Sequence, residues 1–245
     1  MLATYRIGMI TPSVNTALEP LTIEMLKAVD EDVSVHFTRI EVHDVSLDDE
    51  SAHQFTFEAF LQAARLLVDA QVQVVAWNGT SGGWMGIDRE RELAQKIEEI
   101  LGVPFTTTTL ALVSSMKAHG VAKWGLAIPY TVELAEQVAR NYGAEGLECV
   151  RSTVRNWQTE GEVAATPADL RLMIEEAYEP GLDAVAVVCT NLAAAPLVVD
   201  FESEFDTTVF DSIAVTFHHC LGACGIADPA IRNWGRAVAG RAAAG

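Results

Sequence analysis

The feature that most constrains the fold of this chain is an internal repeat of apolar segments that each end in small or polar residues. Residues 7–13 read IGMITPS and residues 124–130 read WGLAIPY, while residues 75–81 read VAWNGTS and residues 185–191 read VAVVCTN. An apolar run that stops at such a turn is typical of a buried strand in a parallel sheet. The repeat therefore predicts two similar halves in which Gly79 and Cys189 are equivalent, with a thiol on one side of a cleft only.

Predicted strands and helices alternate through both halves. The first half predicts strands at 4–11, 33–42, 72–77 and 103–106, and helices at 16–29, 52–70, 87–101 and 108–119. The second half predicts strands at 123–128, 146–152, 183–188 and 207–210, and helices at 131–142, 167–179, 193–203 and 211–224. Such alternation is typical of the α/β class, with parallel sheets flanked by helices. We assign residues 1–112 to lobe 1 and 113–210 to lobe 2, and expect residues 211–245 to pack back on lobe 1.

Composition argues against several classes of function. The 245 residues carry a net charge of −18 and contain no Lys/Arg stripe, which argues against binding to nucleic acid or to acidic membranes. No apolar run approaches the ~20 residues of a membrane span, and the first residues lack a signal-peptide pattern. We therefore expect a cytoplasmic protein with no nucleic-acid or membrane partner. The sequence leaves the oligomeric state open and is compatible with a homo-oligomer.

The cysteine pattern does not predict a disulfide framework or a metal site. The four cysteines, Cys149, Cys189, Cys220 and Cys224, are few and scattered. Cys220 and Cys224 lie one helical turn apart beside two histidines, a combination that can bind zinc, but their helix is largely apolar and favours core packing. No G-x-G-x-x-G motif follows the first strand, which argues against a dinucleotide. We expect neither a metal nor a cofactor.

Polar groups gather at four predicted strand ends, which is where ligands bind in open α/β sheets. These ends are residues 12–16, 78–81, 129–131 and 189–191. Each precedes a predicted helix, and the free N–H groups at four helix starts would hold a carboxylate without Lys or Arg. Taken singly, Asn15, Thr80 and Ser81 are better explained as helix caps. Cys189 is the sharper case, because a thiol that faces helix N–H groups is expected to have a lowered pKa.

Four short motifs, in this order and spacing, resemble the aspartate/glutamate racemase superfamily, and within it the maleate cis–trans isomerases and the arylmalonate decarboxylases. They are Pro12-Ser13-Val14-Asn15-Thr16, Gly79-Thr80-Ser81, Pro129-Tyr130 and Cys189-Thr190-Asn191, within a likeness that extends from Arg6 to about Gly225. The resemblance implies two pseudo-symmetric lobes, an active site in the cleft between them, and chemistry without a cofactor. Racemases of the superfamily use two cysteines, and maleate isomerases carry a pair with one acting as nucleophile. This chain has Gly79 in place of the first cysteine.

Arylmalonate decarboxylases combine Gly-Thr-Ser on one lobe with a single cysteine on the other, as this chain does. The resemblance implies that Thr80, Ser81 and Tyr130, together with backbone N–H groups at 81, 189 and 190, form a dioxyanion hole for one substrate carboxylate. Cys189 would then protonate the carbanion left by loss of the other carboxylate, a role that requires a protonated thiol. Asn15 and Asn191 instead resemble the carboxylate ligands of the isomerase branch.

These observations favour a cofactor-independent decarboxylase of a substituted malonate-like dicarboxylate, with Cys189 as the catalytic residue. The predicted substrate-binding residues are Pro12, Asn15, Gly79, Thr80, Ser81, Tyr130, Thr190 and Asn191. The alternative is a maleate isomerase or racemase-like enzyme that uses Cys189 as nucleophile or base on a small dicarboxylate. A third hypothesis is a two-lobed binding protein without catalysis, against which the thiol at the cleft counts.

Overall fold

Two four-stranded parallel sheets form the centre of the computed structural model, which describes residues 4–42, 45–46, 54–157 and 159–240. The first sheet contains β1 (Tyr5–Pro12), β2 (Val33–Ile40), β3 (Val74–Trp77) and β4 (Phe105–Thr107), in the order β2-β1-β3-β4. The second contains β5 (Lys123–Ile128), β6 (Glu148–Val154), β7 (Ala184–Val187) and β8 (Thr208–Asp211), in the order β6-β5-β7-β8. The same strand order in both sheets confirms the predicted α/β class with two helix-flanked parallel sheets.

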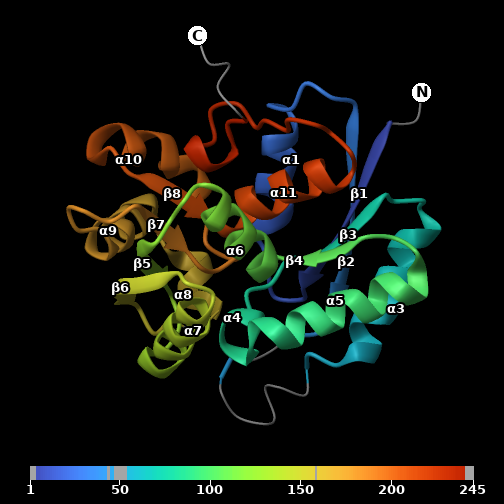
Figure 1. The fold of residues 1–245 in the computed structure, drawn as a ribbon, viewed down its shortest axis with the longest axis horizontal. Coiled ribbons are helices and arrows are strands. Elements are labelled where there is room, and N and C mark those ends of the chain that lie inside the picture. Colours follow the sequence, from blue (N-terminus) through green and yellow to red (C-terminus); the bar gives the residue numbers. More distant parts are fainter. Residues whose placement is uncertain (1–3, 43–44, 47–53, 158, 241–245) are drawn as a thin grey trace.

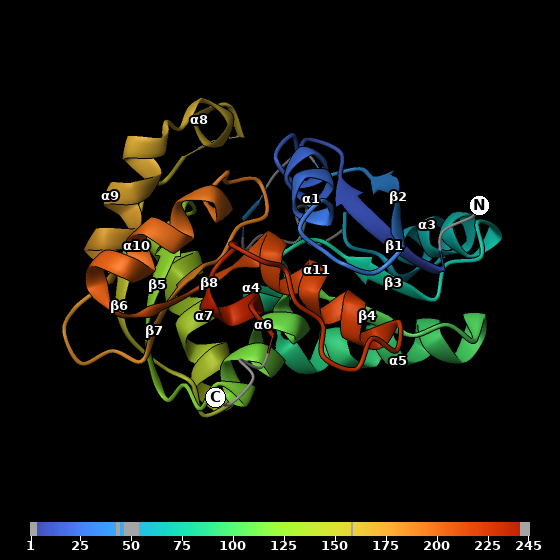
Figure 2. The ribbon, with the colours of Figure 1, turned by 90° about the horizontal axis from the view of Figure 1, so that it is seen from above.

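Helices cover both sheets, and the two lobes lie side by side (Figures 1 and 2). The first half contains α1 (Leu18–Leu26), α3 (Phe57–Asp69), α4 (Gly82–Met85), α5 (Ile87–Leu101) and α6 (Thr108–Ala118). The second half contains α7 (Val132–Ala144), α8 (Thr159–Ala164), α9 (Pro167–Ala177), α10 (Val198–Phe205) and α11 (Ser212–Ala223). Two 3-10 helices, η1 (Ala195–Leu197) and η2 (Arg236–Val238), complete the described elements.

Threonine and aspartate side chains fix the points where several helices begin. Thr107 accepts a hydrogen bond from the third residue of α6, and Thr131 does the same for α7. Thr166 forms a capping box with Asp169 at the start of α9. Such caps satisfy N–H groups that the helix itself leaves unpaired. The caps at 107 and 131 therefore set each helix directly after a strand end and position the turns between them.

The internal repeat is confirmed by the strand register. β1 pairs with β3 from Ile7↔Val74 to Ile10↔Trp77, and β5 pairs with β7 from Trp124↔Ala184 to Ala127↔Val187. Gly79 lies two residues beyond the end of β3, and Cys189 lies two residues beyond the end of β7. The two positions are therefore equivalent in their lobes, as the sequence repeat predicts.

Helices α6 and α11 pack against each other where the lobes meet. Thr216 of α11 donates a hydrogen bond to Thr108 of α6, with 2.9 Å between the hydroxyl oxygens. Helix α11 also contacts α1 and β3, which belong to the first half of the chain. The apolar residues of α6, among them Leu112 and Met116, are buried in the core. None of the helices in the described residues has the length and apolar character needed to cross a membrane.

Several predicted boundaries differ from the observed ones. The short helices α4 and α8 were not predicted, because Gly82-Gly83 and a charged stretch both favour loops by propensity. The helix predicted at 193–203 begins at Ala195 as a 3-10 turn and becomes α-helical at Val198. The helix predicted at 52–70 begins at Phe57, capped by Thr56, and residues 52–53 lie outside the described residues.

Candidate active site

A small cavity lies between the lobes, at the carboxyl ends of β1, β3, β5 and β7. Its volume is about 60 Å³. All nine predicted site residues line it: Pro12, Asn15, Gly79, Thr80, Ser81, Tyr130, Cys189, Thr190 and Asn191. The wall is completed by residues that were not among the predicted site residues: Val14, Val42, Val45, Phe55, Trp77, Trp84 and Glu162. The strand ends therefore converge as parallel-sheet topology requires.

The Cys189 thiol faces this cavity and is almost fully shielded from solvent, with 2 % of the residue exposed. The backbone N–H of Asn191 donates to Sγ at 3.4 Å. Burial raises the pKa of the thiol well above its ordinary value, and the charge of Glu162 adds to this effect. The prediction of a lowered pKa is wrong, because desolvation outweighs the nearby amides and the next helix begins only at Ala195. Cys189 is therefore protonated at neutral pH.

Two hydroxyl groups from opposite lobes meet in the cavity. Thr80 Oγ1 and the Tyr130 hydroxyl lie 3.3 Å apart, within hydrogen-bond distance. The Tyr130 ring packs edge-on against Trp84, with 5.2 Å between ring centroids. Burial raises the pKa of Tyr130 well above its ordinary value, so the phenol keeps its proton. Both groups can therefore donate hydrogen bonds to an oxyanion in the cavity.

The space beside Gly79 is filled by the indole of Trp77. A Cβ atom at residue 79 would lie 2.2 Å from Cζ2 and 2.4 Å from Cε2 of that ring. The indole is held in place, because Nε1 donates to Ser81 Oγ at 3.1 Å and the ring packs edge-on against Phe60 at 5.1 Å. Residue 79 therefore cannot carry a side chain while Trp77 keeps this position.

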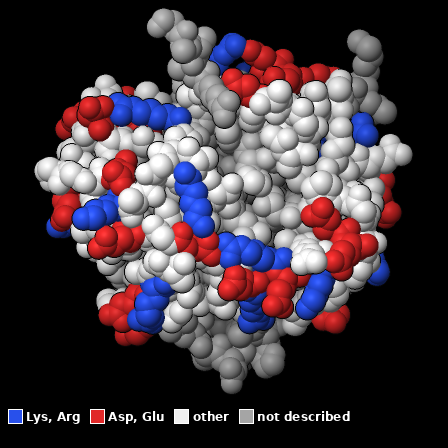
Figure 3. All heavy atoms as spheres, viewed as in Figure 1, with Lys and Arg blue, Asp and Glu red and all other residues white. Residues whose placement is uncertain are grey.

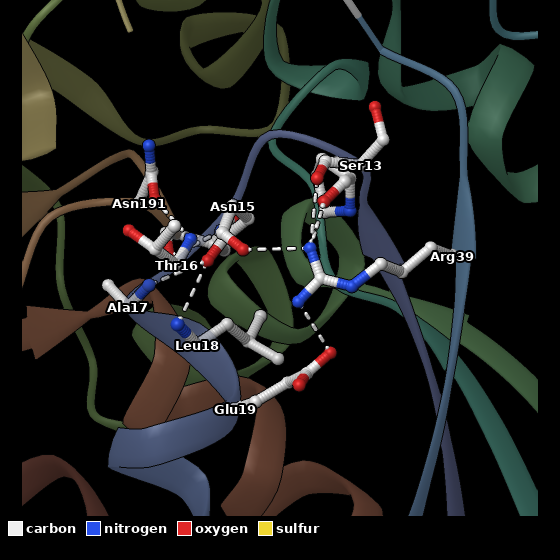
Figure 4. A network of polar contacts seen from close by, with 10 residues as sticks. Ser13, Asn15, Thr16, Ala17, Leu18, Glu19, Arg39 and Asn191 are labelled. Atoms are coloured by element: carbon white, nitrogen blue, oxygen red, sulfur yellow. Dashed lines mark hydrogen bonds and ion pairs between the residues drawn. The ribbon is translucent and has the colours of Figure 1, made fainter. Parts of the chain in front are cut away.

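Asn15 joins the two lobes and organises the start of α1 (Figure 4). Its Nδ2 donates to the backbone oxygen of Thr190 at 2.7 Å, and its Oδ1 accepts from the amides of Ala17 and Leu18. Arg39 holds the preceding turn by donating to the backbone oxygen of Asn15 at 2.9 Å. The Asn15 side chain therefore binds the free amides at the start of α1, as a helix cap does, and also lines the cavity.

Asn191 makes the second link between the lobes. Its Oδ1 accepts from the backbone N–H of Thr16 at 2.9 Å, and its Nδ2 donates to Glu162 Oε2 at 2.9 Å (Figure 4 shows the first of these contacts). Thr190 strengthens the same junction by donating to the backbone oxygen of Asn78 at 2.9 Å. The two residues directly after Cys189 are therefore fixed to the first lobe, at the ends of both β1 and β3.

Glu162 is a titratable cavity residue that sequence reasoning missed. It lies on α8, which reaches the cavity from the second lobe, and it is half-buried. Burial raises its pKa to about 7, although the hydrogen bond from Asn191 works in the opposite direction. The stretch around it is polar and has no clear periodicity, so the sequence did not distinguish Glu162 from the acidic residues that are exposed to solvent.

A larger pocket of about 370 Å³ lies next to the cavity and shares Phe55 and Ser81 with it. Its wall is mostly apolar, with Phe57, Phe60, Met85 and Leu93. The buried carboxyl of Glu90 also lines it and accepts a hydrogen bond from Thr107. Burial raises the pKa of Glu90 to about 7, so this acid is partly neutral under ordinary conditions.

Glu162 is the one acidic side chain among the described residues that line the cavity, and no Lys or Arg is among them. In the described part of the face drawn in Figure 3, Lys and Arg lie close to Asp and Glu, along the left side and across the lower half of the face. Among the described residues, no group of three or more His, Cys, Asp or Glu side chains is arranged to hold a metal ion. Cys220 lies in the buried core on α11, as predicted.

The fold and cavity are those of a two-lobed α/β enzyme with one buried thiol facing converging hydroxyl groups. The family model described as arylmalonate decarboxylase matches residues 7–236. The chain therefore belongs to the arylmalonate decarboxylase family, which confirms the resemblance seen in the sequence.

The relatives of this chain include both maleate isomerases and arylmalonate decarboxylases. The chain is 25 % identical to a maleate isomerase of Alcaligenes faecalis over 249 residues, covering 98 % of both chains. The structure of a maleate isomerase variant from Pseudomonas putida S16 with maleate has a TM-score of 0.87 and 20 % identity, covering 97 % of this chain and 98 % of that one. A structure of arylmalonate decarboxylase has a TM-score of 0.79 and 21 % identity, covering 95 % and 98 %. At these identities, the structural likeness shows the fold.

Proposed function

We propose that this protein is a cofactor-independent decarboxylase of a compact malonate-like dicarboxylate and that Cys189 protonates the reaction intermediate. The observation that carries the proposal is the asymmetry of the cavity. Cys189 is the one cysteine among the described lining residues, and the equivalent position, Gly79, is covered by Trp77. One protonated thiol with no thiol opposite it can deliver a proton from one side. It cannot remove a proton on one face and return it on the other, as a pair of cysteines does.

The arrangement supports a simple sequence of steps. One substrate carboxylate accepts hydrogen bonds from Thr80 and Tyr130, and the other lies against the apolar wall that includes Val42 and Val45. When the second carboxylate leaves as CO2, the electron pair of the broken C–C bond enters an enediolate on the first. Fixed donors aimed at such developing charge lower the barrier by ~3 kcal/mol each. Cys189 then gives its proton to the carbanion carbon, which forms a C–H bond and leaves a thiolate.

Cis–trans isomerisation of a maleate-like acid is the second candidate, and the names of the relatives favour it over decarboxylation. Three curated maleate isomerases are 24–25 % identical to this chain over 89–98 % of its length. In that reaction Cys189 would add to the alkene as a thiolate, allow rotation and be eliminated. The raised pKa of Cys189 and the covered Gly79 weigh against this route, because it needs a nucleophilic thiolate.

A proton NMR time course in D2O distinguishes the two reactions. Phenylmalonate, methylphenylmalonate, methylmalonate and maleate are offered separately to the wild type, to Cys189→Ala and to Cys149→Ala. Cys149 is a half-buried cysteine on β6, outside the described cavity wall, and serves as the matched control. We expect a malonate to decay with one deuterium at the new C–H position, and only Cys189→Ala to lose this activity. Conversion of maleate to fumarate without malonate decay would establish the isomerase instead.

A further inference from the structure

We propose that Glu162 controls the protonation of Cys189 and returns a proton to its thiolate after each turnover. The inference rests on the proposed function, since that function leaves a thiolate that must be recharged. Cys189 itself is buried, so its proton has to come through a group with better access to solvent. Glu162 lines the same cavity and is the half-buried carboxyl among the described residues of its wall.

The geometry places the carboxyl and the thiol on one framework. Asn191 holds both groups, because its side chain donates to Glu162 Oε2 at 2.9 Å and its backbone N–H donates to Cys189 Sγ at 3.4 Å. The side-chain oxygen of Asn191 is in turn fixed by the backbone N–H of Thr16 across the lobe boundary. Glu162 therefore keeps a set position relative to the thiol. Figure 2 shows its helix, α8, at the top of the second lobe, on the same side of the molecule as α1 of the first lobe.

The charges of the two groups are coupled. The charge of Glu162 raises the pKa of Cys189, and burial has already brought the pKa of Glu162 to about 7. Tyr130, the other titratable group of the described cavity wall, stays neutral and adds no charge. Two neighbouring anions in a poorly solvated site disfavour each other, so one proton tends to be shared by the pair. A bound dianionic substrate raises the pKa of Glu162 further, and the carboxyl then holds a proton when the thiol loses its own.

The proton balance closes over one cycle. The S–H bond of Cys189 breaks as the C–H bond of the product forms, which leaves a thiolate. The O–H bond of protonated Glu162 then breaks, directly or through one water, and a new S–H bond forms. The carboxylate finally takes a proton from solvent. The net reaction consumes one proton from water for each CO2 released, as decarboxylation of a dianion to a monoanion requires.

The first test needs no substrate. The rate at which iodoacetamide alkylates Cys189 is followed by peptide mass spectrometry between pH 6 and 10 in wild type, Glu162→Gln and Glu179→Gln. Glu179 is a partly exposed acid that forms an ion pair with Arg151, so Glu179→Gln removes the same charge from a different place on the second lobe. We expect Glu162→Gln to alkylate about tenfold faster at pH 8, since loss of the neighbouring charge lowers the pKa of the thiol. Glu179→Gln should match the wild type, and equal rates in all three would overturn the proposal.

The second test compares the first turnover with continuous turnover, on whichever malonate of the NMR series the wild type decarboxylates. We expect Glu162→Gln to keep the rapid-quench rate of the first turnover within threefold while its steady-state kcat falls about 100-fold. Glu162→Asp should restore part of kcat. Equal loss in both phases would show a positioning role and overturn the relay. If the wild type decarboxylates none of the malonates, the proposed function fails, and alkylation alone decides whether Glu162 governs the thiol.

Discussion

Replacing Gly79 with alanine tests whether the indole of Trp77 prevents residue 79, the position equivalent to Cys189 in the other lobe, from carrying a side chain. The added Cβ would lie 2.2 Å from Trp77 Cζ2, whereas ordinary contacts begin at 3.4 Å, so the ring must move by about 1.2 Å. The indole is 1 % exposed and packs against Phe55 and Phe60, which leaves it little room. Overpacking of this kind costs ~1–3 kcal/mol, and the lost hydrogen bond to Ser81 adds ~1 kcal/mol. We expect Gly79→Ala to lose ~2–4 kcal/mol of unfolding free energy.

Urea unfolding of four proteins measures this effect as a double-mutant cycle: wild type, Gly79→Ala, Trp77→Phe and the double variant. The smaller phenyl ring makes room for the new methyl group, so Gly79→Ala should cost less than ~1 kcal/mol in the Trp77→Phe background. Gly143→Ala is the matched control. A Cβ there meets nothing within 4 Å inside α7, and this exchange should stabilise by ~0.5–1 kcal/mol. The same loss in both Trp77 backgrounds, or no loss in either, would refute the steric explanation.

Three further predictions concern single side chains. Cys189→Ser should lower kcat by at least ~100-fold with little change in melting temperature, and a fall of less than tenfold in the NMR assay would exclude a catalytic thiol. Tyr130→Phe keeps the ring against Trp84 but removes the hydroxyl, so kcat should fall by ~10²–10³-fold, and an unchanged kcat would remove Tyr130 from the oxyanion site. Glu90 holds an extra proton in the folded state between pH 4.5 and about 7. Its stabilising contribution is therefore complete below pH 4.5 and lost as pH rises through 7, by on the order of 3 kcal/mol. The difference in unfolding free energy between wild type and Glu90→Gln should change by a similar amount over this pH range. A difference that does not depend on pH would show that the pKa of Glu90 is not raised by burial.

Both the fold and the place of the site could be predicted from the sequence, because parallel-sheet geometry links the two. Apolar runs mark buried strands, and the residues that follow them must meet at one edge of the sheet. This reasoning brought Thr80, Tyr130 and Cys189 together although they are far apart in the chain. The charge state of Cys189 could not be predicted in the same way, since it depends on how much solvent the lobes exclude. Glu162 was missed because its position depends on a short helix that has no periodic signal.

The asymmetry of the two lobes has a stereochemical consequence. Equivalent backbone positions carry a thiol at 189 and a glycine at 79, and the indole of Trp77 occupies the glycine side. In the proposed decarboxylation, a proton can then reach a planar enediolate from the Cys189 side, while Trp77, whose ring nitrogen already donates to Ser81, supplies no acid on the other side. A substrate with two different substituents should therefore give one enantiomer in large excess. Chiral chromatography of the product from methylphenylmalonate measures this excess, and a racemic product would mean that protonation occurs after the intermediate has left the cavity.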